Sequence, residues 1–333
     1  MGRVVGKFEA ESEVEGMELG LVTRAKAFSF RALASFFRRS RVAENLTNRV
    51  SAVESQLAIY RKLLEELERR TNGYARNEIL EVLWKLTPTR PVDTNFVRYG
   101  NEADGGYVLV DDIKATDVIF SIGLGDDISF DTEIEPHAHN VVLVDHTVPN
   151  FMVPTGKFDF FDIPLVPKES DTGVTLSWLL RTFPGDDHIL KIDIEGAEWG
   201  VLDQISLEDL AAFRQIAVEF HGLTDFADVE RLNLVKRVFD RLRISHAPVL
   251  VHANNCADFL LIGGIAVADV IEVTWLRRDS YSLAPGMDPL ISALFLPNTR
   301  SRIDIGDAWF HEILRRNDLA SHSNDQIVEK EHL

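Results

Sequence analysis

The sequence predicts an α/β fold in which a mostly parallel sheet is wrapped by helices. Between residues 117 and 276, short apolar runs rich in β-branched residues alternate with longer runs of helical spacing. Such alternation is typical of parallel sheets built from strand–helix units. In addition, glycines and carboxylates directly follow several strand-like runs, at the edge where open α/β sheets bind ligands.

One stretch, residues 188–202, is central to this prediction. Its apolar positions have the length of a buried strand, and Gly196 marks the turn into a helical pattern. Lys191, Asp193 and Glu195 alternate with the apolar residues, so a strand would place all three on one face. Charges at the end of a central strand are costly unless that end opens into a site. The simpler alternative, in which Asp193 only caps the next helix, accounts for fewer of the charges.

The composition indicates a globular protein with one large domain or two ordinary ones, since the chain has 333 residues and 45% hydrophobic content. The single cysteine, Cys256, excludes an intrachain disulfide and a cysteine-cluster zinc site, and fits a reducing compartment. The start of the chain lacks the apolar core of a signal peptide, and no apolar run is long enough to span a bilayer. We therefore expect a cytoplasmic protein.

The formal net charge of −18 is unevenly distributed. Residues 1–90 hold 16 Lys+Arg against 12 Asp+Glu, whereas residues 91–333 hold 19 against 41. The second part would repel phosphates, so we expect no nucleic-acid partner for it.

Residues 1–75 are predicted to form an amino-terminal helical region. Residues 19–43 are basic and amphipathic, which suits contact with an anionic membrane surface or packing on the protein's own body. Residues 44–70 carry apolar side chains at alternating steps of four and three, which predicts a coiled coil. These side chains are Leu46, Val50, Val53, Leu57, Tyr60, Leu64 and Leu67. We expect a homo-oligomer through this segment; the alternative is a single helix lying on the main domain.

Residues 76–310 are predicted to form the main domain, followed by a polar tail over 311–333. A short amphipathic helix should end before Pro88. The predicted strands cover 117–122, 141–145, 158–165, 188–194, 215–221, 248–253, 258–265 and 270–276. The predicted helices cover 129–139, 174–183 and 226–242, and a further one begins after Gly196.

A glycine turn and an acid predict a site for an adenosyl ligand. Gly123-Leu-Gly125 follows the first strand, and Asp145 ends the second strand 20 residues after Gly125. In doubly wound folds such glycines let the backbone approach a ligand, and an acid at this spacing binds ribose hydroxyls. Asp126 and Asp127 replace the third glycine of the dinucleotide fingerprint, and they would repel a pyrophosphate. A cationic sulfonium such as S-adenosylmethionine tolerates acids better.

Two motifs at the centre of the chain resemble a known family. Leu190-Lys-Ile-Asp-Ile-Glu-Gly-Ala-Glu198, followed by Ile216-Ala-Val-Glu-Phe-His221, is similar to motifs of the FkbM-type S-adenosylmethionine-dependent methyltransferases. Segments that resemble a related methyltransferase-like branch are Arg98-Tyr-Gly, Asp104-Gly-Gly-Tyr107, Val251-His-Ala-Asn-Asn255 and Glu272-Val-Thr-Trp275. The resemblance covers roughly residues 90–280 and leaves out the amino-terminal helices.

The resemblance implies a Rossmann-like class I methyltransferase fold, with seven strands and an antiparallel last strand. It implies O-methyl transfer from S-adenosylmethionine, often to a hydroxyl of a sugar, glycan or polyketide-type metabolite. The cofactor contacts that we carry over are Ser121, Gly123, Gly125 and Asp145. The sequence departs from the family pattern at two places. Asp126 and Asp127 follow the glycine turn, and Asp145-His-Thr ends the second strand where many relatives show Glu-Pro.

The acceptor half of the site is predicted from two neighbouring strand ends. Asp193 and Glu195 end one strand, and Glu219 and His221 share one face at the end of another. A histidine beside carboxylates is a good base near neutral pH, so His221 is our candidate catalytic base; the alternative is a core histidine bonded to backbone.

Two further interpretations stay open. Asp193, Glu219 and an asparagine such as Asn254 or Asn255 could instead hold Mg²⁺. A cofactor-binding module without turnover, or a nicotinamide-dependent oxidoreductase, would share the glycine turn and the acid that follows the second strand. The module would not need the cluster around His221. The oxidoreductase would need the missing third glycine.

Overall fold

A computed structural model describes residues 76–148, 151–262, 265–286, 294, 296–302 and 304 of the chain. The chain divides into two units after Arg70, and every described residue belongs to the second, Thr71–Leu333. The basic segment over 19–43, the coiled coil over 44–70 and the polar tail over 311–333 are predictions that lie outside the described residues.

The main sheet has seven strands among the described residues. They are β4 (Val118–Ile122), β5 (Asn140–Val144), β6 (Phe158–Phe161), β7 (His188–Ile192), β8 (Phe213–Phe220), β9 (His246–Ala253) and β12 (Ile271–Arg277). Shorter strands are β1 (Thr89–Pro91), β2 (Phe96–Tyr99), β3 (Tyr107–Val110), β10 (Phe259–Ile262), β11 (Ile265–Ala268) and β13 (Leu283–Pro285). The helices are one over 76–85, α3 (Ser129–Ile134), η1 (Glu135–His137), α4 (Leu176–Thr182), α5 (Glu198–Gln204), α6 (Leu207–Leu210), η2 (Leu223–Ala227) and α7 (Val229–Ser245).

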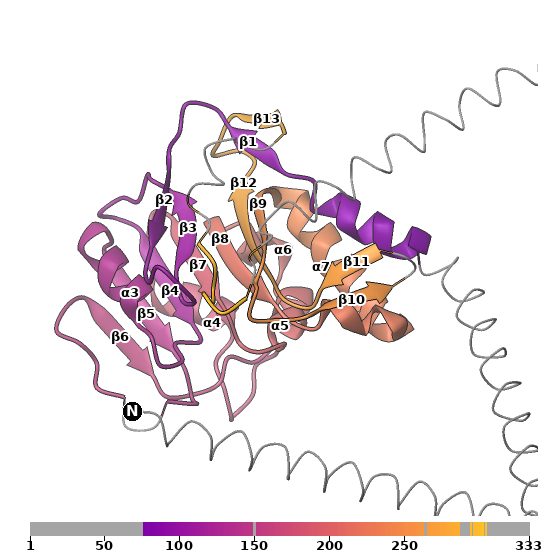
Figure 1. The fold of residues 1–333 in the computed structure, drawn as a ribbon. Coiled ribbons are helices and arrows are strands. Elements are labelled where there is room, and N and C mark those ends of the chain that lie inside the picture. The colour runs from indigo at the N-terminus through magenta and orange to yellow at the C-terminus, as the bar shows by residue number, and fades with distance from the viewer. Residues whose placement is uncertain are drawn as a thin grey trace, which may run out of the picture. The chain divides into compact units, whose positions relative to one another are not determined.

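The sheet has the order β6–β5–β4–β7–β8–β12–β9. The first five of these strands run parallel, and β12 is antiparallel to both of its neighbours. Since β12 is the last of the seven in the sequence, the prediction of a Rossmann-like α/β sheet with an antiparallel last strand is confirmed. Figure 1 shows how the parallel strands lie side by side, so that their carboxyl ends meet at one edge, here called the carboxyl edge.

Alternation along the strands divides the core into two layers. Phe120 of β4 packs with the helix over 76–85 and with α4, α5 and α7, while its neighbour Ile119 packs with α3 and the β2–β3 hairpin. Both side chains are 0% exposed. The predicted short helix before Pro88 is confirmed over 76–85, and Glu78 on it forms an ion pair with Lys236 of α7. One face of the sheet is therefore covered by helices and the other mainly by a short helix and a hairpin.

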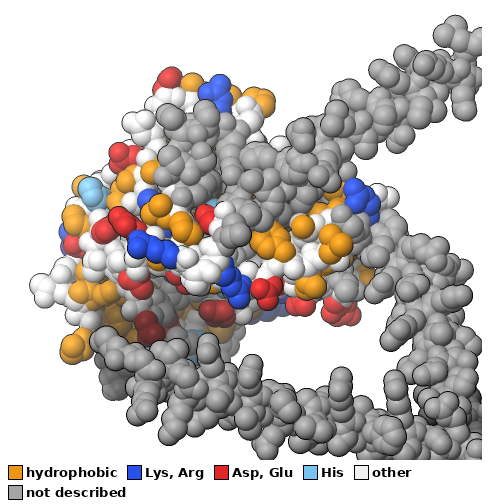
Figure 2. Space-filling view, viewed as in Figure 1, with side chains coloured by type: hydrophobic (Ala, Val, Ile, Leu, Met, Phe, Trp, Pro, Cys, Tyr) orange, Lys and Arg blue, Asp and Glu red, His pale blue; other side chains and the backbone are white. Residues whose placement is uncertain are grey.

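Two hairpins differ from the sequence prediction. The single strand predicted over 258–265 is wrong, because β10 and β11 form an antiparallel hairpin outside the main sheet. The sequence Gly263-Gly264 between them is itself a hairpin signal. Leu260 and Leu261 on β10 are exposed, and Figure 2 shows orange side chains over this part of the molecule. The β2–β3 hairpin was not predicted at all.

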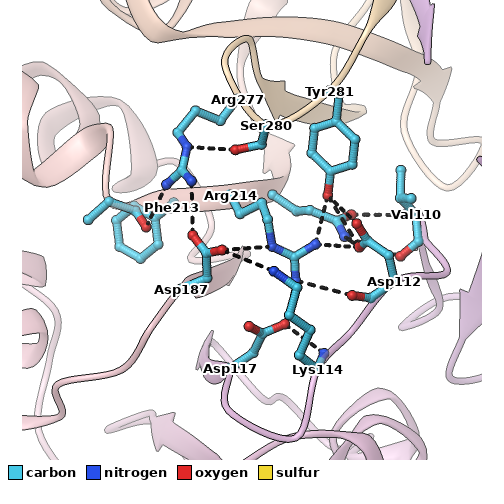
Figure 3. Close-up of polar contacts among 12 residues, drawn as sticks. Val110, Asp112, Lys114, Asp117, Asp187, Phe213, Arg214, Arg277, Ser280 and Tyr281 are labelled. Atoms are coloured by element: carbon cyan, nitrogen blue, oxygen red, sulfur yellow. Dashed lines mark hydrogen bonds and ion pairs between the residues drawn. The ribbon is translucent and has the colours of Figure 1, made fainter. Parts of the chain in front are cut away.

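The edge opposite the carboxyl edge, here called the amino edge, is held by a buried ion network (Figure 3). Arg214, at the start of β8, forms ion pairs with Asp112, Asp117 and Asp187, and its side chain is 3% exposed. Asp187 also pairs with Arg277 at 3.0 Å. The network joins the segments that precede β4 and β7 to the start of β8 and the end of β12.

No helix among the described residues is long and apolar enough to cross a membrane.

Candidate active site

A cavity of about 600 Å³ opens at the carboxyl edge of the sheet. It is lined by the loops that follow β4, β5 and β7, by α3 and by the loop of the β2–β3 hairpin. Sheets of this kind bind ligands at this edge. The predicted residues that line it are Gly123, Gly125, Asp145, Asp193 and Glu195.

The two glycines of the turn after β4 have different tasks. A Cβ atom at Gly123 would lie 1.7 Å from the carbonyl oxygen of Asp193, so only glycine lets the loops after β4 and β7 approach each other. Gly125 has φ of 56° and no atom within 4 Å of where its Cβ would be, so it faces open space in the cavity. Gly125 is therefore the position where a ligand can approach the backbone.

Asp145 is bound to the protein's own loops. Its Oδ2 accepts from the backbone N–H of Leu124 at 2.7 Å and of Gly125 at 3.3 Å, and its Oδ1 accepts from the N–H and hydroxyl of Thr147. Burial alone would raise the pKa of Asp145, but these hydrogen bonds lower it below its usual value. The carboxylate thus holds the glycine turn in shape. Ser121, the remaining predicted cofactor contact, is fully buried and does not line the cavity.

The end of β7 differs from the expected strand. β7 stops at Ile192, so strand alternation does not extend to Asp193 and Glu195. The reason is a turn in which Glu195 has φ of 53° and Gly196 has φ of 101°. Left-handed backbone is strained for a residue other than glycine. The following helix α5 has no side-chain cap, so Asp193 is not a cap as the simpler alternative would require.

Four carboxylates nevertheless converge on His221. Its Nε2 lies 3.5 Å from Glu195, 3.7 Å from Glu219 and 3.8 Å from Asp193. Its Nδ1 lies 3.5 Å from the buried carboxylate of Glu198. The four predicted acceptor-side residues thus come together, because the ends of β7 and β8 are neighbours in the parallel sheet.

The charge excess shifts the proton affinities in this cluster. Burial alone would lower the pKa of His221, but Glu198, Asp193 and Glu195 raise it above its ordinary value. Burial, together with Asp193 and Glu272, raises the pKa of Glu219 well above that of an ordinary glutamate. Surplus carboxylates contribute to both raised pKa values, and the same surplus of negative charge favours cationic ligands.

Three residues at this site were not among the predicted site residues. Glu198 accepts from the backbone N–H of Gly196 and of His221, both at 2.8 Å, and so joins the two loops. Tyr107, on the β2–β3 hairpin, donates to Asp193 at 2.8 Å. Lys191 lines the cavity and donates to the carbonyl of Gly123. Each of the three carried a sequence signal: Lys191 was an unexpected charge in a buried strand, and Glu198 and Tyr107 lie in the family-like motifs.

The same region contains donors that could hold a metal ion. Asp193, Glu219 and His221 bring ligand atoms within 4.8 Å of one another. The asparagine expected beside them does not offer its oxygen, since Asn254 donates to Glu219 at 2.8 Å and its Oδ1 accepts from Cys256 N–H. The Oδ1 of Asn255 accepts from the backbone N–H of Thr299 at 2.8 Å. The structure therefore gives no support for the oxygen-only Mg²⁺ site that the sequence suggested.

Residues 114–243 match the family model of the methyltransferase FkbM domain. This part of the chain is an FkbM methyltransferase domain. It runs from just before β4 to α7, and so contains the glycine turn, Asp145, Asp193, Glu195 and His221. The β2–β3 hairpin that supplies Tyr107 lies before the FkbM domain.

Comparisons with other proteins give weaker likenesses. No significant match was found among curated proteins. Among solved structures, N-methyltransferase NodS from Bradyrhizobium japonicum WM9 with S-adenosyl-L-homocysteine is 9% identical, with a TM-score of 0.28 over 50% of this chain and 79% of NodS. The 23S rRNA methyltransferase ErmE is 11% identical, with a TM-score of 0.28 over 50% of this chain and 64% of ErmE. A dimethyladenosine transferase from Plasmodium falciparum is 13% identical, with a TM-score of 0.28 over 51% and 58%.

Proposed function

We propose that the chain transfers a methyl group from S-adenosylmethionine to a hydroxyl of a sugar, glycan or polyketide-type acceptor. The observation that carries this proposal is an acid-lined cavity within an FkbM domain. It is lined by the glycine turn after β4 and by Asp193 and Glu195, which lie beside His221; His221 and Glu219 do not themselves line it. A sulfonium ligand is cationic and is attracted to such a cavity, whereas the pyrophosphate of a dinucleotide is repelled.

The cofactor half consists of the loops after β4 and β5. Gly125 lets the backbone approach the adenosyl group, and Gly123 keeps this turn against the end of β7. Asp145 shapes the same turn through Leu124 and Gly125 and borders the cavity, where it would meet the ribose. Ser121 lies on β4 before this turn and is buried, so we do not retain it as a direct cofactor contact.

The acceptor half consists of Asp193, Glu195, Glu219 and His221. Methyl transfer needs a hydroxyl placed in line with the sulfonium and a group that accepts its proton. His221 is the proposed base, and the carboxylate of Glu198 lies 3.5 Å from its Nδ1. The exposed side chain of Glu195 is free to bind acceptor hydroxyls, since 89% of its surface is accessible.

Other parts of the proposal concern partners. We propose a cytoplasmic homo-oligomer that assembles through residues 44–70 and contacts anionic membrane through residues 19–43. Removing residues 1–72 should leave a folded monomer that binds cofactor, as measured by light scattering. An unchanged oligomeric state would place the association elsewhere.

Pelleting of residues 19–43 with anionic liposomes at low salt tests the membrane contact, and no pelleting would contradict it.

The activity is tested with methyl-labelled S-adenosylmethionine and a panel of hydroxylated sugars, glycans and polyketides. Calorimetric titration with S-adenosylmethionine and with NAD separates a methyltransferase from an oxidoreductase. We expect binding of the first ligand only. The methyl-transfer assay repeated with EDTA tests whether Mg²⁺ is needed. A loss of turnover that added Mg²⁺ restores would support a role for the metal. Binding of NAD without binding of S-adenosylmethionine would overturn the proposal.

A further inference from the structure

Lys191 is a buried cation that uses little of its hydrogen-bonding capacity. The residue is 5% exposed, yet among the described residues its Nζ makes one hydrogen bond, to the carbonyl oxygen of Gly123. Asp193 lies 3.8 Å away, and the ring of Tyr107 lies 5.0 Å from Nζ. An ammonium has three N–H donors, and a desolvated donor without an acceptor is unfavourable. The position therefore has room for a further acceptor from a ligand.

The charges around the cavity show which ligand group belongs there. Seven carboxylates line the cavity, namely Asp104, Asp126, Asp127, Asp131, Asp145, Asp193 and Glu195. The basic side chains that line the cavity are Lys191 and His146, and His146 is exposed. S-adenosylmethionine carries a sulfonium, an ammonium and one carboxylate. The two cations suit the acids, but the carboxylate is repelled everywhere except next to a cation.

We infer that Lys191 binds the α-carboxylate of the methyl donor, and this inference rests on the proposed function. Lys191 is on the strand that leads to Asp193, and its Nζ lies beside the glycine turn. It therefore stands between the two halves of the site. The acids select the positive groups of the donor, and Lys191 selects its negative one. Ligands that lack the carboxylate should then gain nothing from Lys191.

Decarboxylated S-adenosylmethionine differs from the natural donor by the loss of this carboxylate, which makes it the probe. Both ligands are titrated by calorimetry into the full chain, as wild type and as Lys191→Met. We expect the variant to bind S-adenosylmethionine roughly tenfold to a hundredfold more weakly, the usual range for a charged hydrogen bond. Decarboxylated S-adenosylmethionine should bind the variant as well as wild type or more tightly, because a repelling cation has been removed. Lys114→Met, an exposed lysine at the amino edge, is the matched control and should change neither affinity.

The outcomes separate the alternatives. If Lys191 only holds the glycine turn, the variant will weaken both ligands by the same factor, and the inference is overturned. Unchanged affinity for both ligands overturns it as well. If Lys191→Met does not fold, Lys191→Gln is used, with circular dichroism as the check. Failure of the wild type to bind either ligand would remove the proposed function, and with it this inference.

Discussion

The two edges of the sheet both collect buried charged groups, but they balance them differently. At the amino edge, Arg214 meets Asp112, Asp117 and Asp187, and Asp187 also meets Arg277. Each acid there has a cationic partner. At the carboxyl edge, four carboxylates surround His221, and the nearby cation Lys191 lies 3.8 Å from Asp193, one of the four.

The pKa values of two histidines differ between the edges in the same sense. At the amino edge, burial lowers the pKa of His246 to about 4, and its Nε2 hydrogen bonds to the carbonyl of Phe213. At the carboxyl edge the pKa of His221 is raised, because neighbouring carboxylates outweigh burial. A balanced edge serves stability. Surplus negative charge at the carboxyl edge is electrostatically unfavourable in the folded chain. This indicates that a bound ligand supplies the balancing positive charge.

The largest expected effect tests the role of the carboxyl edge. His221→Ala should lower turnover by about 10²–10⁴-fold, the usual contribution of a general base, with little change in affinity for S-adenosylmethionine. Because carboxylates raise the pKa of His221, its base form gains population at a higher pH than that of an ordinary histidine. Wild-type turnover should therefore climb with pH there, and the variant should lose that rise. Single-turnover rates equal to wild type at every pH would make His221 structural.

The amino edge should respond in stability instead. Arg214→Met leaves Asp112, Asp117 and Asp187 without their shared cation, and Asp117 is 0% exposed. Breaking a buried ion pair typically destabilises by about 3–5 kcal/mol. Urea unfolding measures this, with Arg237→Met as the control. Arg237 pairs with Asp203 and its side chain is 55% exposed, so its loss should change the free energy by less than about 1 kcal/mol. Equal effects of the two variants would refute the comparison.

His246 gives a pH test of the same edge. Its pKa is about 4 in the folded chain, against an ordinary value of 6.5, so the unfolded chain takes up the proton first as pH falls. The contribution of neutral His246 to the free energy of unfolding is complete above pH 6.5 and is lost as pH falls from 6.5 to 4. At about 1.4 kcal/mol per pKa unit, it amounts to roughly 3 kcal/mol. The free energy of unfolding of His246→Gln should fall less over this range than that of wild type. Parallel curves would contradict the assignment.

The smallest effect concerns Glu195. Its φ of 53° is strained for glutamate, so Glu195→Gly should raise the free energy of unfolding by about 1 kcal/mol. The same change removes a carboxylate 3.5 Å from His221 and should lower turnover. If the free energy of unfolding rises while turnover in the methyl-transfer assay falls, the strained backbone of Glu195 is retained because its side chain is needed for activity. A loss of stability would show that the turn is not strained.

Much of the fold could be predicted, since the strands are continuous apolar runs and the helices have periodic apolar faces. Local patterns could also place Asp193 and His221 at neighbouring strand ends. The partners of Arg214 could not be predicted, because Asp112 and Asp117 are about 100 residues away in sequence. The bonds of Asp145 were missed for another reason: backbone N–H groups occur at every residue except proline, so the sequence does not show which of them a carboxylate will meet.

The central claim is that surplus negative charge at the carboxyl edge serves a cationic donor. It is tested most directly by titrating S-adenosylmethionine and its neutral product, S-adenosylhomocysteine, into wild type at about 0.01 M and about 1 M salt. These ligands differ by the methyl group and its positive charge. We predict tighter binding of S-adenosylmethionine at low salt and a smaller difference at high salt. Tighter binding of S-adenosylhomocysteine at both salt concentrations would contradict the claim.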